Sequence, residues 1–127
     1  IDCTPALDLP TWDNSENTSY NTRLGAGPAI YIADGATLSD PRIIHHLTET
    51  AAAENIPYQF RQPGSGGTDA GAIHRQRSGI PSVSISVPGR YAHTAAGIAR
   101  ISDWENTLRL VHSALTRLTP AIFDTDR

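Results

Sequence analysis

Lysine is absent from this 127-residue chain, and all ten of its cationic residues are arginines. The absence excludes Schiff-base chemistry through a lysine amine, and it excludes the phosphate-binding lysine of nucleotide-binding loops. Methionine is absent too, and the first residues, Ile1-Asp2-Cys3-Thr4, have the pattern of a strand interior. We therefore expect the chain to be part of a longer protein.

Cysteine, long hydrophobic runs and a strong excess of one charge are also missing. The single Cys3 cannot form an internal disulfide, which favours a reducing cytoplasm as the location. No apolar run reaches the length of about 18 residues that a membrane span needs. A net charge of −3 without a basic stripe argues against a nucleic-acid partner. With 39% hydrophobic and 18% charged residues, the chain has the composition of one globular domain.

Short apolar segments alternate along the chain with helical patterns. Strands are expected near residues 1–4, 28–33, 57–61 and 81–87, and helices near 40–55, 69–78 and from 102 onward. This alternation predicts an α/β fold of layered α/β/α type, with a largely parallel, mixed sheet. In such sheets ligands bind beyond the carboxyl ends of the strands.

The helical segments carry recognisable start signals. Asp40-Pro41 supplies an N-cap followed by a proline in the first turn. A capping box at Ser102–Glu105 is expected to open the last helix. The apolar stripe of that helix is expected to pack on the sheet, and it comprises Trp104, Leu108, Val111, Leu115 and Leu118.

The segment GSGGTDAGAIH, residues 64–74, gathers four glycines around Asp69. One interpretation is a tight strand-to-helix turn in which Thr68 or Asp69 caps the helix. A phosphate-binding loop fits badly, because no GK[ST] follows and Asp69 stands where a dinucleotide-binding loop needs its third glycine.

Asp2, Asp8 and His93 are ligand-type residues without a self-contained metal motif. HExxH and CxxC are absent, His45-His46 point to different faces of a helix, and GxSxG is absent as well. Asp2 is expected at the end of the first strand and His93 just beyond the strand at 81–87. From the residues alone, His93 is either structural or a ligand, and the two aspartates are either solvated, backbone caps or ligands.

Six motifs in order resemble one family. They are IDCTPALDLP, LGAGPAIYIAD, IPYQ, GGTDAGAIH, GIPSVSISVPGRYAH and DWENTLRLV. Together they cover nearly the whole chain and are similar to the C-terminal part of the glutamyl aminopeptidase, tetrahedral aminopeptidase or cellulase M family of metallopeptidases. The resemblance implies the C-terminal portion of a catalytic domain that removes N-terminal residues from peptides, with two divalent metal ions (zinc, cobalt or manganese). It also implies a homo-oligomer for the full-length protein.

The resemblance implies roles for individual residues. Asp2 ligates one metal ion and His93 the other, while Gly67, Thr68 and Asp69 lie on the substrate side, where backbone without side chains lets an extended peptide approach closely. Arg90 contacts substrate or, as an equal alternative, pairs with a nearby carboxylate. Asp8 either orients the strand end that carries Asp2 or caps backbone amides. The sequence differs from the family pattern in HTAAG, residues 93–97. Relatives usually carry Ser and then an acidic residue after the histidine.

The resemblance also implies what lies outside these residues. In the family, a His, a bridging Asp, an adjacent Glu pair and an inserted dimerisation domain precede the segment, whereas the four glutamates of this chain are never adjacent. We therefore expect no catalytic base in the chain and no activity of the chain alone. Two other functions remain open: a non-catalytic binding or assembly module, and a glycoside hydrolase that uses Asp2 and Asp69 as its carboxyl pair.

Overall fold

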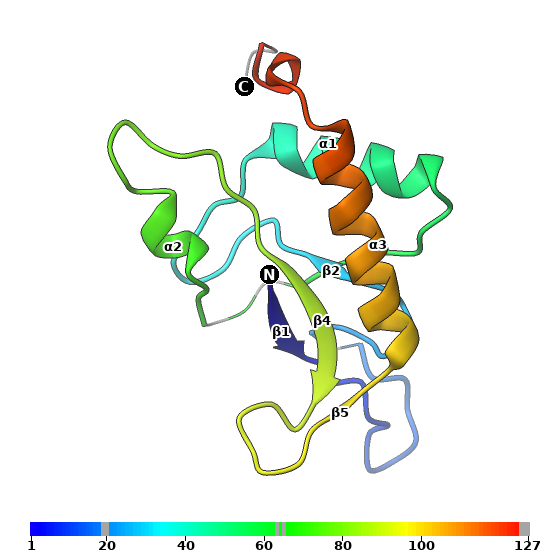
Figure 1. The fold of residues 1–127 in the computed structure, drawn as a ribbon. Helices are drawn as coiled ribbons and strands as arrows, with labels where there is room; N and C mark the ends of the chain where they lie inside the picture. The colour runs from blue at the N-terminus through cyan, green and yellow to red at the C-terminus, as the bar shows by residue number, and fades with distance from the viewer. Residues whose placement is uncertain (19–20, 63, 65, 125–127) are drawn as a thin grey trace.

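The computed structural model describes residues 1–18, 21–62, 64 and 66–124. Its strands and helices are β1 (Asp2–Pro5), β2 (Ala29–Ile30), α1 (Pro41–Ala53), β3 (Gln59–Phe60), α2 (Ala70–Ile73), β4 (Ile85–Arg90), β5 (Ile98–Ala99), α3 (Ile101–Arg117) and the 3₁₀ helix η1 (Pro120–Phe123). Figure 1 shows α1 and α3 crossing beside the sheet, with the N-terminus next to β4. No helix in this described part of the chain is both long and apolar enough to cross a membrane.

One mixed sheet organises the chain. The strand order is β1-β4-β2-β3, and β5 pairs with the end of β4. The pairs β1–β4 and β2–β3 are parallel, whereas β4 runs antiparallel to β2 and to β5. The predicted α/β fold with a mixed sheet is therefore confirmed.

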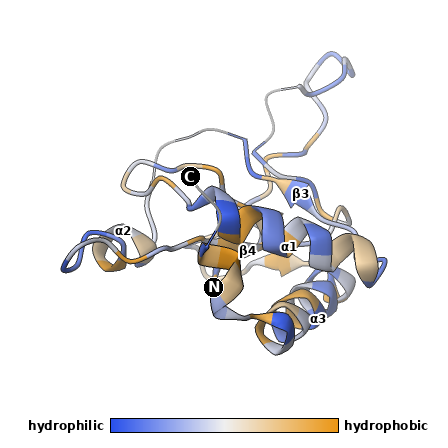
Figure 2. Cartoon of the chain, turned by 90° about the horizontal axis from the view of Figure 1, so that it is seen from above, coloured by the Kyte–Doolittle hydropathy of each residue, from blue (hydrophilic) through white to orange (hydrophobic). Residues whose placement is uncertain are grey.

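The core lies between the sheet and the helix pair α1 and α3. Its buried side chains are Ile30, Leu47, Ala51, Ile56, Ile85, Leu110 and Ala114. Figure 2 shows α1 and α3 side by side near the apolar β4, and α2 standing apart from them. The short helix α2 therefore belongs to the loops that surround the sheet edge and contributes little to the core.

Helix α1 begins where the sequence predicts. The Asp40 carboxylate accepts a hydrogen bond from the backbone N–H of Arg42 at 3.0 Å, as an N-cap should. The helix ends at Ala53, and Asn55 takes a left-handed conformation with φ of 51°. Both ends of this helix follow from local chemistry, which explains why the sequence locates them well.

Three predicted boundaries differ from the structure. The strand expected at 81–87 begins only at Ile85 and runs to Arg90, and the strand expected at 28–33 shortens to β2. The helix expected at 69–78 contains only Ala70–Ile73, followed by turns up to Gly79 with φ of 99°. A hydrogen bond from Tyr31 N to Ser84 O still joins the two apolar segments beyond the regular ladder, and one from Asp40 N to Ser82 O joins the start of α1 to the later segment.

The expected packing of α3 is wrong. The helix begins at Ile101 without a side-chain cap, so the capping box at Ser102–Glu105 does not form. Trp104, Leu108 and Leu115 are 57%, 56% and 65% exposed, and Leu118 is 45% exposed. Val111 alone of the predicted stripe is partly buried against the core. The buried face consists instead of Asp103, Thr107, Leu110 and Ala114.

Candidate active site

A cavity of about 430 Å³ lies where β1, the glycine-rich segment and the loop after β4 meet. It brings together Asp2 and His93, which are 91 positions apart in the sequence. The lining residues are Asp2, Cys3, Thr4, Pro5, Leu7, Asn21, Tyr31, Arg61, Gln62, Gly64, Gly66, Gly67, Thr68 and His93. An adjoining cavity of about 670 Å³ is also lined by Asp2, Gly67 and Thr68, and additionally by Asp69.

Asp2 is the first residue of β1. The expectation that it ends this strand is therefore wrong. It pairs in register with Ser86 in the interior of β4. Its side chain is exposed, and one carboxylate oxygen accepts the N–H of Cys3 at 2.8 Å. Asp2 and His93 line the same cavity, which leaves Asp2 available as a metal ligand.

His93 reaches the same cavity because the chain turns back after β4. Tyr91 and His93 have φ of 61° and 62°, a left-handed conformation that is uncommon for residues other than glycine. The Thr94 hydroxyl closes this turn, with Oγ1 2.7 Å from Tyr91 O and 3.0 Å from Ala96 O. Thr94 therefore supplies local support at the position where the motif HTAAG departs from the family pattern.

The glycines of residues 64–71 serve two local purposes. Gly66 has φ of 95° and accepts a hydrogen bond from Gly35 N at 2.8 Å. Gly71 packs so closely on Ala36 that an added Cβ would stand 2.7 Å from the Ala36 Cβ. A Cβ at Gly66 would meet nothing within 4 Å, so the backbone there borders open space. The tight-turn interpretation describes the close packing at Gly71, and the backbone at Gly66 is open enough for a ligand to approach.

Thr68 and Asp69 make different contacts. Thr68 Oγ1 lies 2.6 Å from Ser84 Oγ, which ties the glycine-rich segment to the residues just before β4. Asp69 precedes α2 but makes no side-chain capping hydrogen bond, which rules out the alternative in which its carboxylate caps this helix. Its exposed carboxylate lines the larger cavity together with Asp2.

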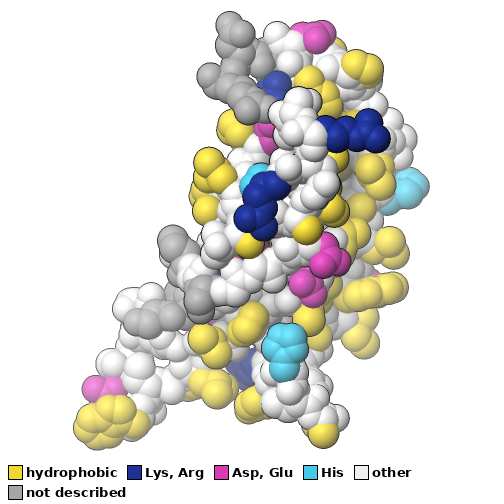
Figure 3. Space-filling view, turned by 90° about the vertical axis from the view of Figure 1, so that its left-hand side faces the viewer, with side chains coloured by type: hydrophobic (Ala, Val, Ile, Leu, Met, Phe, Trp, Pro, Cys, Tyr) yellow, Lys and Arg dark blue, Asp and Glu magenta, His cyan; other side chains and the backbone are white. Residues whose placement is uncertain are grey.

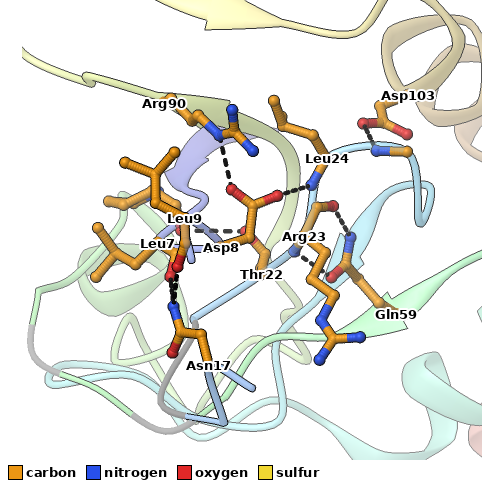
Figure 4. A network of polar contacts seen from close by, with 12 residues as sticks. Leu7, Asp8, Leu9, Asn17, Thr22, Arg23, Leu24, Gln59, Arg90 and Asp103 are labelled. Carbon is orange, nitrogen blue, oxygen red and sulfur yellow. Dashed lines mark hydrogen bonds and ion pairs between the residues drawn. The ribbon is translucent and has the colours of Figure 1, made fainter. Parts of the chain in front are cut away.

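Asp8 and Arg90 form an ion pair next to the site (Figure 4). Arg90 Nε donates to Asp8 Oδ1 at 2.7 Å, and Leu24 N donates to Asp8 Oδ2 at 2.9 Å. Burial raises the pKa of Asp8, but the hydrogen bonds from Arg90 and Leu24 and the guanidinium charge outweigh it and hold the pKa below its usual value. Of the two alternatives for Arg90, pairing with a carboxylate is the one visible in the structure.

Two polar side chains that the sequence did not single out hold the loop before β2. Buried Asp103 accepts hydrogen bonds from Gly25 N at 2.7 Å and Gly27 N at 3.0 Å. Gln59 bonds to both backbone groups of Arg23 and to Gly27 O, each at 2.9 Å. An acidic residue in a first helical turn is ordinary, so no local signal marks Asp103 as the anchor of a distant loop.

Arg61 is a further cavity residue that the sequence did not reveal. It follows β3, is only 8% exposed, and places its Cζ 4.7 Å from the centroid of the Tyr31 ring. Its Nε lies 3.4 Å from Thr4 Oγ1, and its Nη1 lies 3.4 Å from Gln62 O. Arg61 thereby brings a permanent positive charge to the cavity that Asp2 and His93 line.

The donor set in this cavity fits part of a metal site. Asp2 offers carboxylate oxygen and His93 offers imidazole nitrogen, both of which suit zinc, cobalt and manganese. Within the described residues, no group of three or more His, Cys, Asp or Glu side chains is placed to hold a metal ion. Two donors do not complete a four-coordinate site, so a metal bound here needs further ligands.

Comparison with known proteins finds relatives that are named aminopeptidases. A glutamyl aminopeptidase of Lactococcus lactis subsp. cremoris is 32% identical over 93% of this chain and 31% of its own length. A lysyl aminopeptidase of Pyrococcus furiosus is 31% identical over 79% of the chain and 28% of its own length. The chain therefore spans about a third of the length of these relatives.

Solved structures also resemble this chain. An aminopeptidase from the archaeon Desulfurococcus kamchatkensis superposes with a TM-score of 0.87 at 31% identity, over 94% of this chain and 34% of the other. PhTET1-12s, a dodecamer in the asymmetric unit, superposes with a TM-score of 0.67 at 26% identity, over 77% of this chain and 29% of the other. The family model described as M42 glutamyl aminopeptidase matches residues 1–110. The chain belongs to the M42 glutamyl aminopeptidase family.

Proposed function

We propose that the polypeptide containing this chain is a metal-dependent aminopeptidase with a dinuclear site. The observation that carries the proposal is the convergence of Asp2 and His93 on one cavity beside Gly67 and Thr68. When bound, two divalent ions would polarise the scissile carbonyl and lower the pKa of the attacking water. Asp2 would hold one ion through its carboxylate, and His93 would hold the other through a neutral imidazole.

The glycine-rich segment would bind the peptide substrate. Gly66 and Gly67 present exposed backbone to the cavity, and without side chains this backbone admits an extended peptide closely. Thr68, fixed by Ser84, and Asp69 would continue this substrate side into the adjoining cavity. Arg90, engaged by Asp8, would act mainly by holding the strand end from which the His93 loop departs.

The exposed stripe on α3 supports the proposal that these 127 residues are the C-terminal portion of a larger catalytic domain. The stripe comprises Ile101, Trp104, Leu108 and Leu115. Ile1, which is 83% exposed, lines one surface hollow together with Trp104 and Leu108. Figure 3 shows hydrophobic side chains over several parts of the surface, among them the right-hand edge of the view. We propose that the rest of the catalytic domain covers this stripe, because a single helix rarely keeps such an apolar face in water.

The proposal extends to the oligomeric state and to the location of the protein. Since a solved relative is a dodecamer in the asymmetric unit, we propose a homo-oligomer of the complete protein, which light scattering would test. The unpaired Cys3 fits a reducing cytoplasm.

The central test measures hydrolysis and metal content together. The complete polypeptide should release the first residue from aminoacyl anilides in the presence of Co²⁺ or Zn²⁺, and a chelator should stop it. Asp2→Ala and His93→Ala should each lower bound metal and abolish turnover, whereas the exposed controls Asp13→Ala and His112→Ala should not. The isolated chain should bind zinc weakly and release nothing. Chelator-sensitive turnover by the isolated chain would contradict the expectation that the catalytic base lies outside these 127 residues.

A glycoside hydrolase is the second candidate, because Asp2 and Asp69 line the same larger cavity. Sugar hydrolysis by a carboxyl pair needs no metal. Hydrolysis of a cello-oligosaccharide that persists in chelator and is lost in Asp69→Asn would favour this candidate. Absence of sugar hydrolysis, together with metal-dependent peptide hydrolysis, would exclude it.

A further inference from the structure

We propose that the loop 7–17 binds the peptide substrate beyond its first residue and favours peptides with a large apolar side chain there. The inference rests on the proposed aminopeptidase function and adds to it a second recognition surface, outside the part of the cavity proposed to hold metal. The side chains that carry the inference are Leu7, Leu9 and Trp12, which are 60%, 45% and 97% exposed. Large apolar side chains gathered on one exposed segment are typical of a binding surface.

The loop 7–17 begins inside the cavity that His93 lines. Leu7 belongs to the lining of that cavity. Asp8, the next residue, accepts a hydrogen bond from Arg90 at 2.7 Å, and the chain leads from Arg90 on to His93. Figure 1 shows the first loop, in blue, and the loop after β4, in yellow-green, extending from the same end of the sheet. The loop 7–17 therefore continues the wall of the cavity outward at the end where His93 lies.

Leu7 and Leu9 lie on the same side of their segment. Side chains of an extended chain alternate in direction, and Figure 4 shows the Asp8 carboxylate turned toward Arg90 while the two leucine side chains point the other way. The Asn17 side chain fixes this arrangement, because its Nδ2 donates to the carbonyl oxygens of Leu7 and Leu9 at 2.8 Å each. The two leucines thus form the start of an apolar surface that leads away from the cavity.

The loop is preformed. Asn17 closes it onto a residue ten positions earlier, which is the geometry of a compact Ω-loop. Thr11 holds the tip, since its Oγ1 lies 2.6 Å from Asp13 Oδ1 and 2.9 Å from Ser15 O. Trp12 lies between these two anchors in the sequence and is almost fully exposed. A tryptophan on such a fixed loop binds a ligand with little loss of conformational entropy, because its side chain has only two rotatable bonds.

The path of a bound peptide follows from the lining of the cavity. Gly66 and Gly67 offer exposed backbone there, and Leu7 offers an apolar side chain in the same lining. An extended peptide uses both, with its backbone on the glycines and alternate side chains on the leucine. Each residue of an extended chain advances about 3.3 Å, so the peptide reaches Leu9 about two residues later and Trp12 only when it is longer still. An aminoacyl anilide ends before these two side chains.

The first experiment uses the unaltered complete polypeptide with cobalt and needs no variant. Values of kcat/KM are measured for Leu-anilide and for pentapeptide amides that begin with Leu and carry a single Phe or Gly, in an alanine background, at the third, fourth or fifth position. We expect Phe to exceed Gly by about tenfold or more at one of these positions, because one large apolar side chain is buried.

Two results would count against the proposals, and they are distinguishable. Equal kcat/KM for Phe and Gly at all three positions would overturn the inference and leave the aminopeptidase proposal intact, since the peptides are still cleaved. Cleavage of neither the anilide nor any peptide would contradict the aminopeptidase proposal, and this inference with it.

The second experiment separates recognition from support of the fold. In Leu9→Ala and Trp12→Ala, the advantage of the preferred Phe peptide over its Gly counterpart should fall to about threefold or less, while Leu-anilide changes less than about twofold. Trp12→Phe should retain most of the advantage, and Leu38→Ala, at a 75% exposed leucine outside this loop, should retain all of it. Equal losses for anilide and Phe peptide would show that the loop merely supports the fold. An undiminished advantage in both alanine variants would overturn the inference.

Binding without turnover gives an independent readout. A Phe peptide whose first amide is replaced by a methylene amine is not hydrolysed, and calorimetry measures its Kd. We expect this Kd to rise about tenfold or more in Trp12→Ala, with the Kd of the matching Gly analogue unchanged. Equal changes for the two analogues would contradict recognition of the apolar side chain by Trp12.

Discussion

Replacing Asp103 by alanine should destabilise the protein by about 2–4 kcal/mol. Asp103 is 1% exposed, and its carboxylate accepts hydrogen bonds from the N–H groups of Gly25 and Gly27 at 2.7 and 3.0 Å. Gly27 is buried, so its N–H would lose its partner without gaining water, at a cost of about 1–3 kcal/mol. Gly25 is exposed, so water can replace the carboxylate there, and the loss is about 1 kcal/mol.

The assay is urea denaturation followed by tryptophan fluorescence and by circular dichroism. Asp103→Asn should fall between the parent and Asp103→Ala, since an amide oxygen still accepts one hydrogen bond but without charge. Ser102→Ala, on the exposed side of the same helical turn, is the matched control and should change the free energy of unfolding by less than about 0.5 kcal/mol. An Asp103→Ala protein within that same margin would refute the assignment of Asp103 as the anchor of residues 25–27.

Two further predictions concern charge and packing. Because the folded-state pKa of Asp8 is lowered, the Asp8–Arg90 pair stabilises the protein fully above a pH of about 5, and the contribution is lost as pH falls through the folded pKa. In Asp8→Asn the free energy of unfolding should therefore fall less between pH 7 and pH 3 than in the parent, as measured by urea denaturation. An equal fall in the two proteins would contradict this prediction. On α3, Leu110→Asp should abolish folding because Leu110 is fully buried, whereas Leu115→Asp should be tolerated in the isolated chain and disrupt the complete polypeptide. Solubility and thermal melting distinguish these outcomes, and a complete polypeptide indifferent to Leu115→Asp would contradict the proposal that further chain covers the stripe.

Local chemistry accounts for what sequence reasoning located well. The start of α1 needs only Asp40 and Pro41, and its left-handed end is made at Asn55. The α/β class follows from the alternation of segments, which packing does not change. The family was recognisable from motifs, and it directed attention to Asp2 and His93 before any geometry was known.

Tertiary structure decided what local patterns leave open. Helical periodicity showed that α3 is amphipathic, but the chain buries the face with Asp103 and Thr107, because the Asp103 carboxylate satisfies distant backbone amides there. Asp2 and His93 share a cavity only because β1 pairs with β4 and the chain then turns back at two left-handed residues. Arg61 enters the same cavity through contacts with Thr4 and Tyr31, which are 57 and 30 residues away. Such contacts depend on strand register and on buried polar partners, and neither is encoded in any short stretch of sequence.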